Sequence, residues 1–238
     1  MEPSDRPTGH AEALAAYHAE HVLGCTKCPL AEGRTTVVAG SGNPDARVMF
    51  VGEAPGYHED RQGVPFVGQA GRLLDELLER IGLARDDVFI ANVLKCRPPG
   101  NRNPTAREIE ACEPHLFRQV AIIQPMLVCS LGNFATRLLS GRPDSISRVH
   151  GCELPLEIRG VPTLLYPLFH PAAALYTPAM RATLETDMDR IPELIGTAGE
   201  LRERGAAPAV PSVDAPRPPE PTVPAAPPPD TSEQLGLF

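Results

Sequence analysis

The 238-residue chain predicts an α/β fold of three layers, αβα, with a central, mostly parallel four-stranded sheet. Three observations support this prediction. Four short apolar runs have the length and β-branched composition of strands, helical patterns separate them, and the runs are continuously apolar rather than alternating. A strand that is apolar on both sides is buried on both faces, which is typical of a parallel sheet with helices on each side.

The expected strands cover residues 48–52, 88–93, 126–131 and 163–168. A helix over residues 69–81 follows from leucine and isoleucine side chains that recur on one helical face. A second helix should begin near Thr105, because Thr105 and Glu108 have the spacing of a capping box and Pro104 precedes them. An N-terminal helix should precede Cys25, and a final helix over residues 180–204 should end the globular part.

The chain is expected to form one domain over residues 11–204, after a disordered N-terminus over residues 1–10. Residues 205–233 are rich in proline and alanine, which predicts a disordered, extended linker. No apolar run approaches the ~20 residues that a membrane-spanning helix needs, and the first residues have no signal-peptide pattern. We therefore expect a cytoplasmic monomer without membrane contact.

The formal net charge of −8 argues mildly against a nucleic-acid partner. Its distribution weakens that argument, because the last 34 residues carry four acids and one base. A nucleic-acid-binding face would have to be a local basic cluster, such as Arg97, Arg102 and Arg107. Net charge therefore does not decide the class of partner.

The six cysteines do not predict disulfides, because no export signal accompanies them. Cys25 and Cys28 form a C-x-x-C pattern, Cys96 follows the second strand, and Cys112 lies in the helix after it. Four thiolates suit either a tetrahedral zinc ion or a cubane iron–sulfur cluster, and the spacing leaves both open. The role would be structural in either case. Cys129 lies in an apolar run and is expected to be a small buried side chain.

Candidate binding residues follow the strands, as expected for a parallel α/β sheet, where ligands bind beyond the carboxyl ends. The first strand runs into a loop over residues 52–71 that is rich in glycine and proline, where backbone can approach a ligand. This loop matches neither common nucleotide-binding pattern. Asn92 ends the second strand and His170 follows the fourth.

A series of motifs in this order resembles the family 4 uracil-DNA glycosylases of bacterial type. The motifs are GEAPG-x-x-ED, G-x-PFVG-x-AG, N-x-x-KCRPP-x-NR-x-P, LG-x-x-A and FHPA, and the resemblance covers about residues 11–195. It implies hydrolysis of the N-glycosidic bond of uracil in single- or double-stranded DNA, which leaves an abasic site and starts base excision repair. It also implies a structural [4Fe-4S] cluster held by Cys25, Cys28, Cys96 and Cys112.

The resemblance further implies how uracil is bound. An enzyme that acts on a base in duplex DNA must flip it into a pocket, where Phe66 would stack on it. Asn92 would donate to uracil O4 and accept from N3–H, a pattern that cytosine reverses. His170 would donate to uracil O2, where negative charge develops as the bond breaks.

The loop after the first strand should line the pocket through Glu53, Ala54 and Pro55. Ala54 stands where better-studied uracil glycosylases have an acid that orients water. Glu59, or else Glu53, would position the water or shape the pocket against the methyl group of thymine. A dissociative path through an oxocarbenium-like sugar tolerates a weak nucleophile.

The last five residues, 234–238, resemble the pentapeptide by which bacterial proteins dock in the sliding clamp of replication. Gln234 would make polar contacts, Leu237 and Phe238 would be the anchors, and Leu235 lies between them. Two other functions stay open from the sequence. The chain could be a glycosylase for another damaged base, or a non-catalytic iron–sulfur DNA-binding module; a zinc-bound structural protein is a third alternative.

Overall fold

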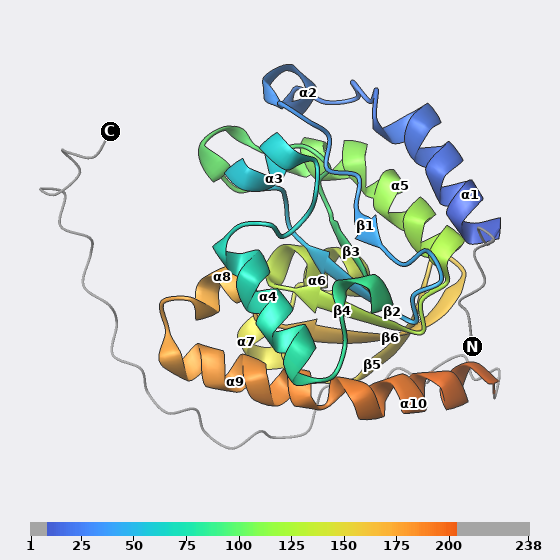
Figure 1. Ribbon diagram of the computed structural model, residues 1–238, viewed down its shortest axis with the longest axis vertical. Coiled ribbons are helices and arrows are strands. Elements are labelled where there is room, and N and C mark those ends of the chain that lie inside the picture. Colours follow the sequence, from blue (N-terminus) through green and yellow to red (C-terminus); the bar gives the residue numbers. More distant parts are fainter. Residues whose placement is uncertain (1–8, 204–238) are drawn as a thin grey trace, which may run out of the picture.

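A computed structural model describes residues 9–203 (Figure 1), and a six-stranded sheet lies at its centre. The four expected strands are confirmed as β2 (Val48–Gly52), β3 (Phe89–Asn92), β4 (Leu127–Leu131) and β6 (Val161–Leu168). They pair in the order β3-β2-β4-β6, and every pair is parallel. Parallel pairing brings their carboxyl ends to one edge of the sheet.

The sheet has six strands rather than the four expected, because a short antiparallel strand covers each edge. β1 (Ser41–Gly42) pairs with β3, and β5 (Leu154–Ile158) pairs with β6. Neither strand has an apolar run that would reveal it. β1 has only two residues, and β5 is half-buried along most of its length and contains proline and glutamate. Edge strands need no continuous apolar face, so the pattern that found the inner strands misses them.

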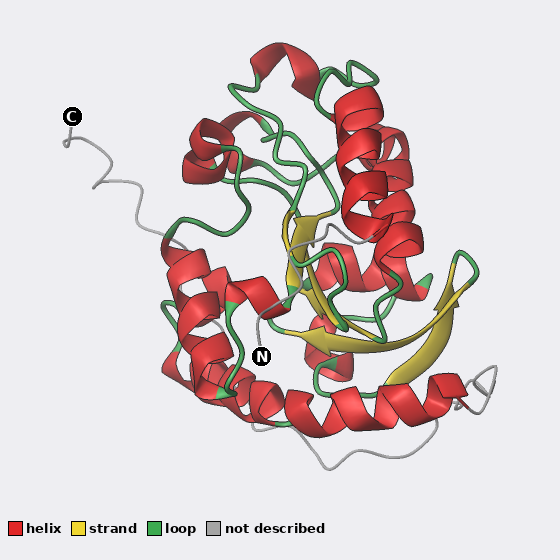
Figure 2. Cartoon of the chain, turned by 45° about the vertical axis from the view of Figure 1, so that its right-hand side comes forward, coloured by secondary structure: helices red, strands yellow, loops and turns green. Residues whose placement is uncertain are grey.

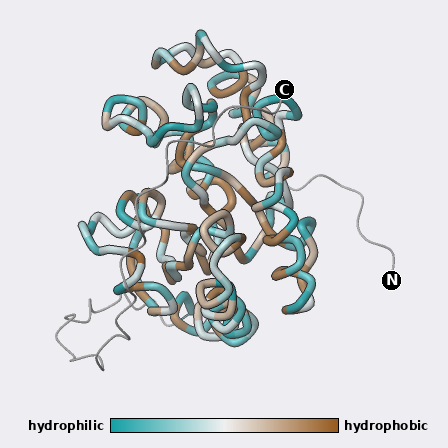
Figure 3. The backbone as a smooth tube through the Cα atoms, turned by 90° about the vertical axis from the view of Figure 1, so that its left-hand side faces the viewer, coloured by the Kyte–Doolittle hydropathy of each residue, from teal (hydrophilic) through white to brown (hydrophobic). Residues whose placement is uncertain are grey.

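Helices cover both faces of the sheet, which confirms the three layers (Figure 2). α1 (Gly9–Tyr17), α5 (Ala106–Ile123) and α6 (Asn133–Ser140) contribute to one hydrophobic core. α4 (Gln69–Arg80), α9 (Pro178–Asp189) and α10 (Ile191–Glu203) contribute to the other. Apolar segments lie in the interior of the molecule in Figure 3, with hydrophilic segments on outer loops.

Shorter elements connect these layers. They are α2 (Leu30–Gly33), α3 (Tyr57–Gln62), α7 (Ile146–Val149) and α8 (Pro171–Ala174), together with a π-helical turn, η1 (His18–Val22), and two 3₁₀ turns, η2 (Arg85–Asp87) and η3 (Pro99–Asn101). Within the described residues, no helix has the length and apolar character needed to cross a membrane.

The start of α5 is confirmed by its capping box. The Thr105 hydroxyl accepts from the Glu108 N–H at 3.3 Å, and the Glu108 carboxylate accepts from the Thr105 N–H at 2.8 Å. The prediction of one final helix was wrong, because α9 and α10 are separate helices that meet at Arg190. Pro192 has no N–H, and its ring would clash with the carbonyl four residues earlier, so a continuous helix is disfavoured.

α1 begins at Gly9 and α10 ends at Glu203, while the expected domain over residues 11–204 stays a prediction. The predicted linker over residues 205–233 and the predicted clamp-binding peptide over residues 234–238 lie outside the described residues.

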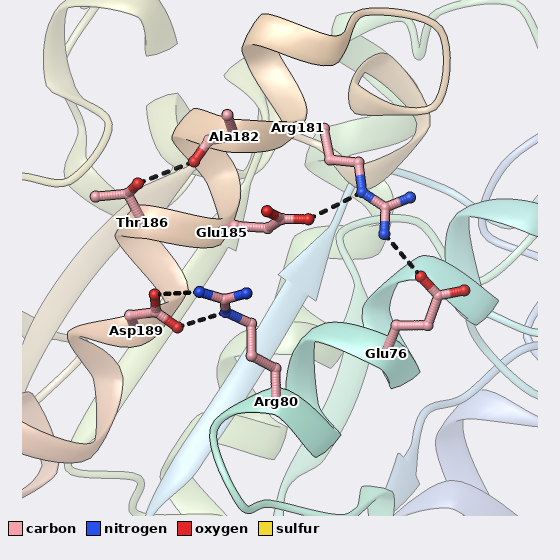
Figure 4. A network of polar contacts seen from close by, with 7 residues as sticks. All are labelled: Glu76, Arg80, Arg181, Ala182, Glu185, Thr186 and Asp189. Atoms are coloured by element: carbon pink, nitrogen blue, oxygen red, sulfur yellow. Dashed lines mark hydrogen bonds and ion pairs between the residues drawn. The ribbon is translucent and has the colours of Figure 1, made fainter.

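Ion pairs fasten α9 to α4, the helix that follows the pocket loop (Figure 4). The Arg80 guanidinium donates to both carboxylate oxygens of Asp189, at 2.7 and 2.8 Å. Arg181 donates to Glu185 at 2.9 Å and to Glu76 at 3.0 Å. These pairs are exposed and screened by solvent, so they contribute little and the apolar core beneath them dominates.

Candidate active site

A pocket of about 410 Å³ lies at the carboxyl ends of the parallel strands. Its volume is within the range of small-molecule sites. Gly52 and Asn92 are register partners at the ends of β2 and β3, while His170 follows β6 by two residues. The structure brings together all the pocket residues expected from the sequence, which are Glu53, Ala54, Pro55, Glu59, Phe66, Asn92 and His170.

The Asn92 side chain presents an unpaired acceptor at this pocket. Asn92 is 2% exposed, and its Oδ1 is the one buried side-chain polar atom among the described residues that has no hydrogen-bond partner. Gly52 makes room for it, because a Cβ at Gly52 would lie 2.4 Å from Oδ1 and 2.7 Å from the Phe66 ring. An unpaired buried acceptor costs about 1–3 kcal/mol. Such an atom is expected where a ligand supplies the missing donor.

The backbone of Asn92 is held from behind by a buried lysine. Lys95 Nζ donates to the Asn92 carbonyl at 2.8 Å and to Gln119 Oε1 at 2.6 Å. Gln119 Nε2 in turn donates to the Ala39 carbonyl at 2.6 Å and lies 2.8 Å from His18 Nε2. Burial lowers the pKa of Lys95 to about 8. This network fixes the end of β3 relative to α5 and the N-terminal segment.

Phe66 has a backbone conformation that aromatic residues rarely adopt, with φ at 54°. Its ring is 5% exposed and lies 5.6 Å from the His170 ring, with an angle of 26° between the planes. Arg85 donates to the carbonyls of Pro65 and Phe66 at 2.6 and 2.8 Å, and to Asp75 at 2.8 Å. The guanidinium thus fixes the two carbonyls that flank the left-handed residue.

The Glu59 carboxylate holds the same loop from the other side. Its Oε1 accepts from the N–H groups of Val67 and Gly68, both at 2.9 Å. Glu59 therefore has a positioning contact that sequence reasoning did not anticipate. Glu53 also lines the pocket, and burial raises its pKa. Which of the two carboxylates acts on water stays a prediction.

The geometry of His170 identifies its tautomer. Nδ1 accepts from the Ala172 N–H at 3.1 Å, so the proton of the neutral ring is on Nε2. Desolvation lowers the pKa of His170 to about 4, although Glu59 raises it by a smaller effect. At neutral pH the ring is therefore an uncharged donor through Nε2–H.

The loop after β3 supplies another wall of the pocket, through Pro98, Asn101 and Arg102. Arg102 donates to both carboxylate oxygens of the buried Glu108, at 2.6 and 2.9 Å. The hydrogen bond from Arg102 is the largest cause that lowers the pKa of Glu108, to about 2. The charge of Arg102 is thus already paired, which removes it from the basic cluster expected from the sequence.

The four cysteines of the predicted cluster site come together beside the end of β3. Cys96 and Cys112 are buried, and Cys25 and Cys28 are half-buried. Burial is the largest cause that raises the pKa of Cys112, to about 11, and the neighbouring Cys96 and Cys28 raise it further. The pKa of Cys96 is likewise raised by burial first and then by Cys28 and Cys25.

Donor groups surround these sulfur atoms. The Lys95 N–H donates to Cys112 Sγ at 3.2 Å, Arg34 donates to Cys96 Sγ at 3.4 Å, and His115 Nε2 lies 3.4 Å from Cys25 Sγ. Among residues 9–203, no three or more His, Cys, Asp or Glu side chains are arranged to hold a single metal ion. Cys129 lies in β4 and is fully buried, as predicted.

The family model of the uracil DNA glycosylase superfamily matches residues 39–190, more than half of the chain. The type-4 uracil-DNA glycosylase of Sulfurisphaera tokodaii is 47% identical over 180 residues, which cover 74% of this chain and 82% of the relative. The chain belongs to the type-4 uracil-DNA glycosylases. The enzyme of the same type from Archaeoglobus fulgidus is 46% identical over 74% of this chain and 90% of its own. That from Thermotoga maritima is 47% identical, over 69% and 84%.

In this glycosylase, two positioning residues were missed by sequence reasoning. Arg85 lies 19 residues from Phe66, and no local pattern relates the two. Lys95 follows the apolar residues Val93 and Leu94 just after β3. A lysine beside such a run was the sequence signal that could have indicated a buried, hydrogen-bonded ammonium group.

Proposed function

We propose that this glycosylase hydrolyses the N-glycosidic bond of uracil in DNA, which leaves an abasic site and starts base excision repair. The observation that carries the proposal is the unpaired Asn92 Oδ1 at the pocket. The family supports the same activity, since relatives with 44–47% identity are named type-4 uracil-DNA glycosylases.

Uracil has the polar groups that such a pocket can complement. Its N3–H would donate to Asn92 Oδ1, and its O4 would accept from the amide N–H₂ of the same side chain. Cytosine presents an acceptor at N3 and an amino donor at position 4, so both contacts would be lost. Because each unpaired buried polar group costs about 1–3 kcal/mol, two mismatched contacts would disfavour cytosine by about 2–6 kcal/mol. Phe66 would stack on the base and add about 1–3 kcal/mol.

His170 would stabilise the leaving group. When the bond between C1′ and N1 breaks, its electron pair moves onto uracil and negative charge develops at O2. A neutral imidazole that is already oriented by the Ala172 N–H can donate Nε2–H to that oxygen. Water then forms the new bond to C1′ and loses a proton, while uracil takes one up.

A carboxylate at the pocket would position that water. Because Glu59 Oε1 is bonded to two loop amides, Glu59 has only Oε2 to offer, whereas Glu53 has a pKa raised by burial. Separate Glu59→Gln and Glu53→Gln variants test this step. Replacement of the residue that positions water should lower kcat and leave the affinity for free uracil almost unchanged.

The deciding experiment uses a single-stranded oligonucleotide with one uracil, followed by alkali cleavage of abasic sites. The wild type should cleave at uracil, and an Asn92→Ala/His170→Ala variant should not. Oligonucleotides with cytosine, thymine or hypoxanthine at the same position test selectivity. Folded wild-type protein that leaves uracil intact would refute the proposed activity, and preference for another base would refute the assignment of Asn92.

We also propose that Cys25, Cys28, Cys96 and Cys112 hold a structural [4Fe-4S] cluster. Tetrahedral zinc with Zn–S bonds of about 2.3 Å needs sulfur atoms within roughly 4 Å of each other, and a four-iron cluster accepts wider spacing. The N–H donors of Arg34 and Lys95 beside the sulfur atoms suit thiolates of a cluster. The cluster would tie the N-terminal segment to β3 and α5. Protein purified without oxygen should be brown and contain iron and sulfide in equal amounts; stoichiometric zinc would refute the proposal.

The remaining sequence predictions lead to two smaller proposals. The four thiolates suit a reducing compartment, which supports a cytoplasmic location. Residues 234–238 would dock the enzyme on the sliding clamp and raise its local concentration at DNA. A variant that lacks these five residues should lose clamp binding and keep its activity on short oligonucleotides, and unchanged clamp binding would refute the second proposal.

A further inference from the structure

An exposed tyrosine that contacts two arginines stands at the rim of the pocket. Tyr57 opens α3 and is 49% exposed. The Arg97 guanidinium carbon lies 5.2 Å from the centre of its ring, and that of Arg61 lies 5.7 Å from it. Arg61 also donates to the Tyr57 hydroxyl at 3.3 Å. We call Tyr57, Arg61 and Arg97 the rim cluster.

The charges of the rim cluster are not neutralised by carboxylates. Neither Arg61 nor Arg97 forms an ion pair with any of the described residues 9–203. The two acids of α3 point their oxygens elsewhere, since Glu59 accepts from loop amides and Asp60 accepts from the Thr35 N–H at 2.9 Å. Two full positive charges therefore stand together in a protein with a net charge of −8.

The rim cluster is also joined directly to the pocket wall. Tyr57 follows Gly56, and Arg97 precedes Pro98, both of which line the pocket. Arg97 Nε donates to Asn101 Oδ1 at 2.7 Å, and Asn101 is another lining residue. In Figure 1, α3 lies beside the green loop that leaves β3. Two segments far apart in the sequence thus meet at one side of the opening.

We propose that the rim cluster binds phosphates of the DNA strand beside the nucleotide whose base enters the pocket. A base held in the pocket leaves its own sugar and the adjoining phosphates at the rim, where anions would meet Arg61 and Arg97. The Tyr57 ring restrains both guanidinium groups by cation–π contact, so less side-chain entropy is lost when they bind. The inference rests on DNA as the substrate and adds the surface that holds it.

The basic cluster expected from the sequence is changed by this inference. Arg97 remains, Arg102 is paired with Glu108, and Arg61 joins from a different segment. Sequence proximity alone could not select Arg61, because α3 and the loop after β3 meet only in the folded chain.

Salt dependence measures phosphate contacts directly. Each phosphate neutralised on a single strand contributes about 0.7 to the slope of log affinity against log salt. An Arg61→Gln/Arg97→Gln variant should therefore lose about 1.4 from the slope. The ratio of its KM to that of the wild type should then be about sevenfold larger at roughly 50 mM salt than at 200 mM. The loss should appear in KM rather than kcat.

The matched control is Arg80→Gln/Arg181→Gln, which removes the same charge from the exposed network of Figure 4 and should keep the wild-type slope. Because Arg97 adjoins the proposed cluster ligand Cys96, the single variant Arg61→Gln is measured as well and should lose about half of the effect. Tyr57→Leu should weaken binding, whereas Tyr57→Phe, which keeps the ring, should recover most of it.

The same salt series is run by fluorescence anisotropy with a uracil-free strand, so that the surface is tested even if excision fails. A slope reduced in the rim variants and unchanged in the control supports the proposal. Equal slopes in wild type and Arg61→Gln/Arg97→Gln would overturn it, as would an equal loss in the control. Absence of uracil excision together with the reduced slope would instead count against the proposed activity alone.

Discussion

Replacement of Arg85 by methionine should release Phe66 from its left-handed conformation and weaken uracil binding. Methionine keeps much of the length of the side chain and removes its charge and donors. The change deletes two hydrogen bonds to the carbonyls of Pro65 and Phe66 and one ion pair with Asp75. Arg85 itself is not a lining residue of the pocket, so the change acts on the pocket through Phe66 alone.

The size of the effect can be worked out from these contacts. Each of the two hydrogen bonds to the charged guanidinium contributes about 1.5–3 kcal/mol, but the Arg85 side chain is 29% exposed, which reduces their sum. We therefore expect a loss of about 2–3 kcal/mol in the free energy of unfolding. A left-handed non-glycine residue costs about 1–2 kcal/mol, so Phe66 gains by relaxing once its carbonyl is free. If the ring then loses its stacking position, uracil binding falls by about 1–3 kcal/mol, or roughly five- to 150-fold.

The assay is inhibition by free uracil combined with urea denaturation. Arg80→Met is the matched control, since Arg80 also makes an ion pair, a bidentate one with Asp189, but lies in the network of Figure 4. Because its ion pair is exposed, Arg80→Met should lose much less stability than Arg85→Met and should bind uracil normally. A Phe66→Ala background completes a double-mutant cycle. Arg85→Met should have little further effect on uracil binding there; the same loss with and without the ring would refute the role of Arg85.

Three further predictions concern other residues of the site. The rate of single-turnover excision should stay constant as pH falls from about 7.5 to 5.5 and should decline only towards pH 4. The reason is that burial lowers the pKa of His170 to about 4 and that the neutral ring is the donor. A fall in rate near pH 6.5 that depends on His170 would contradict this. Gly52→Ala should abolish excision at a stability cost of about 1–3 kcal/mol, because its Cβ would lie 2.4 Å from Asn92 Oδ1; cleavage at the wild-type rate would show that the pocket is not where we place it. Glu108→Gln should lower the free energy of unfolding by about 1–2 kcal/mol at neutral pH, through loss of the ion pair with Arg102. Since the pKa of Glu108 is lowered to about 2 in the folded state, its stabilisation is complete above the ordinary value of 4.5 and disappears as pH falls towards 2. The free energies of unfolding of wild type and variant, measured by urea titration, should therefore differ at neutral pH and converge at acid pH. A difference that does not change with pH would disprove the linkage.

The sequence determined the inner sheet and the position of the pocket. Continuous apolar runs predicted β2, β3, β4 and β6, because a strand buried on both faces has to be apolar at every position. Parallel strands end at one edge, so Asn92, His170 and the loop that carries Phe66 could be expected to meet there. The capping box at Thr105 was equally legible, since both partners lie within one helical turn.

Patterns of this kind fail where an element does not need a buried face or where a helix is interrupted. The sequence did not predict the two edge strands, because half-buried or two-residue strands have no periodic apolar signal. The break between α9 and α10 was overlooked although Pro192 stands in the sequence, because the apolar pattern continues on both sides of it.

Only the tertiary structure decided how the pocket residues are held. Glu59 turned out to bind the Val67 and Gly68 amides, Arg85 to fix the Phe66 carbonyl, and Asn92 Oδ1 to be left without a partner. Secondary structure and burial follow from the periodicity of neighbouring residues, which any stretch of sequence displays. A hydrogen bond between groups that lie 19 residues apart depends on where packing places both ends, and that placement is a property of the whole fold.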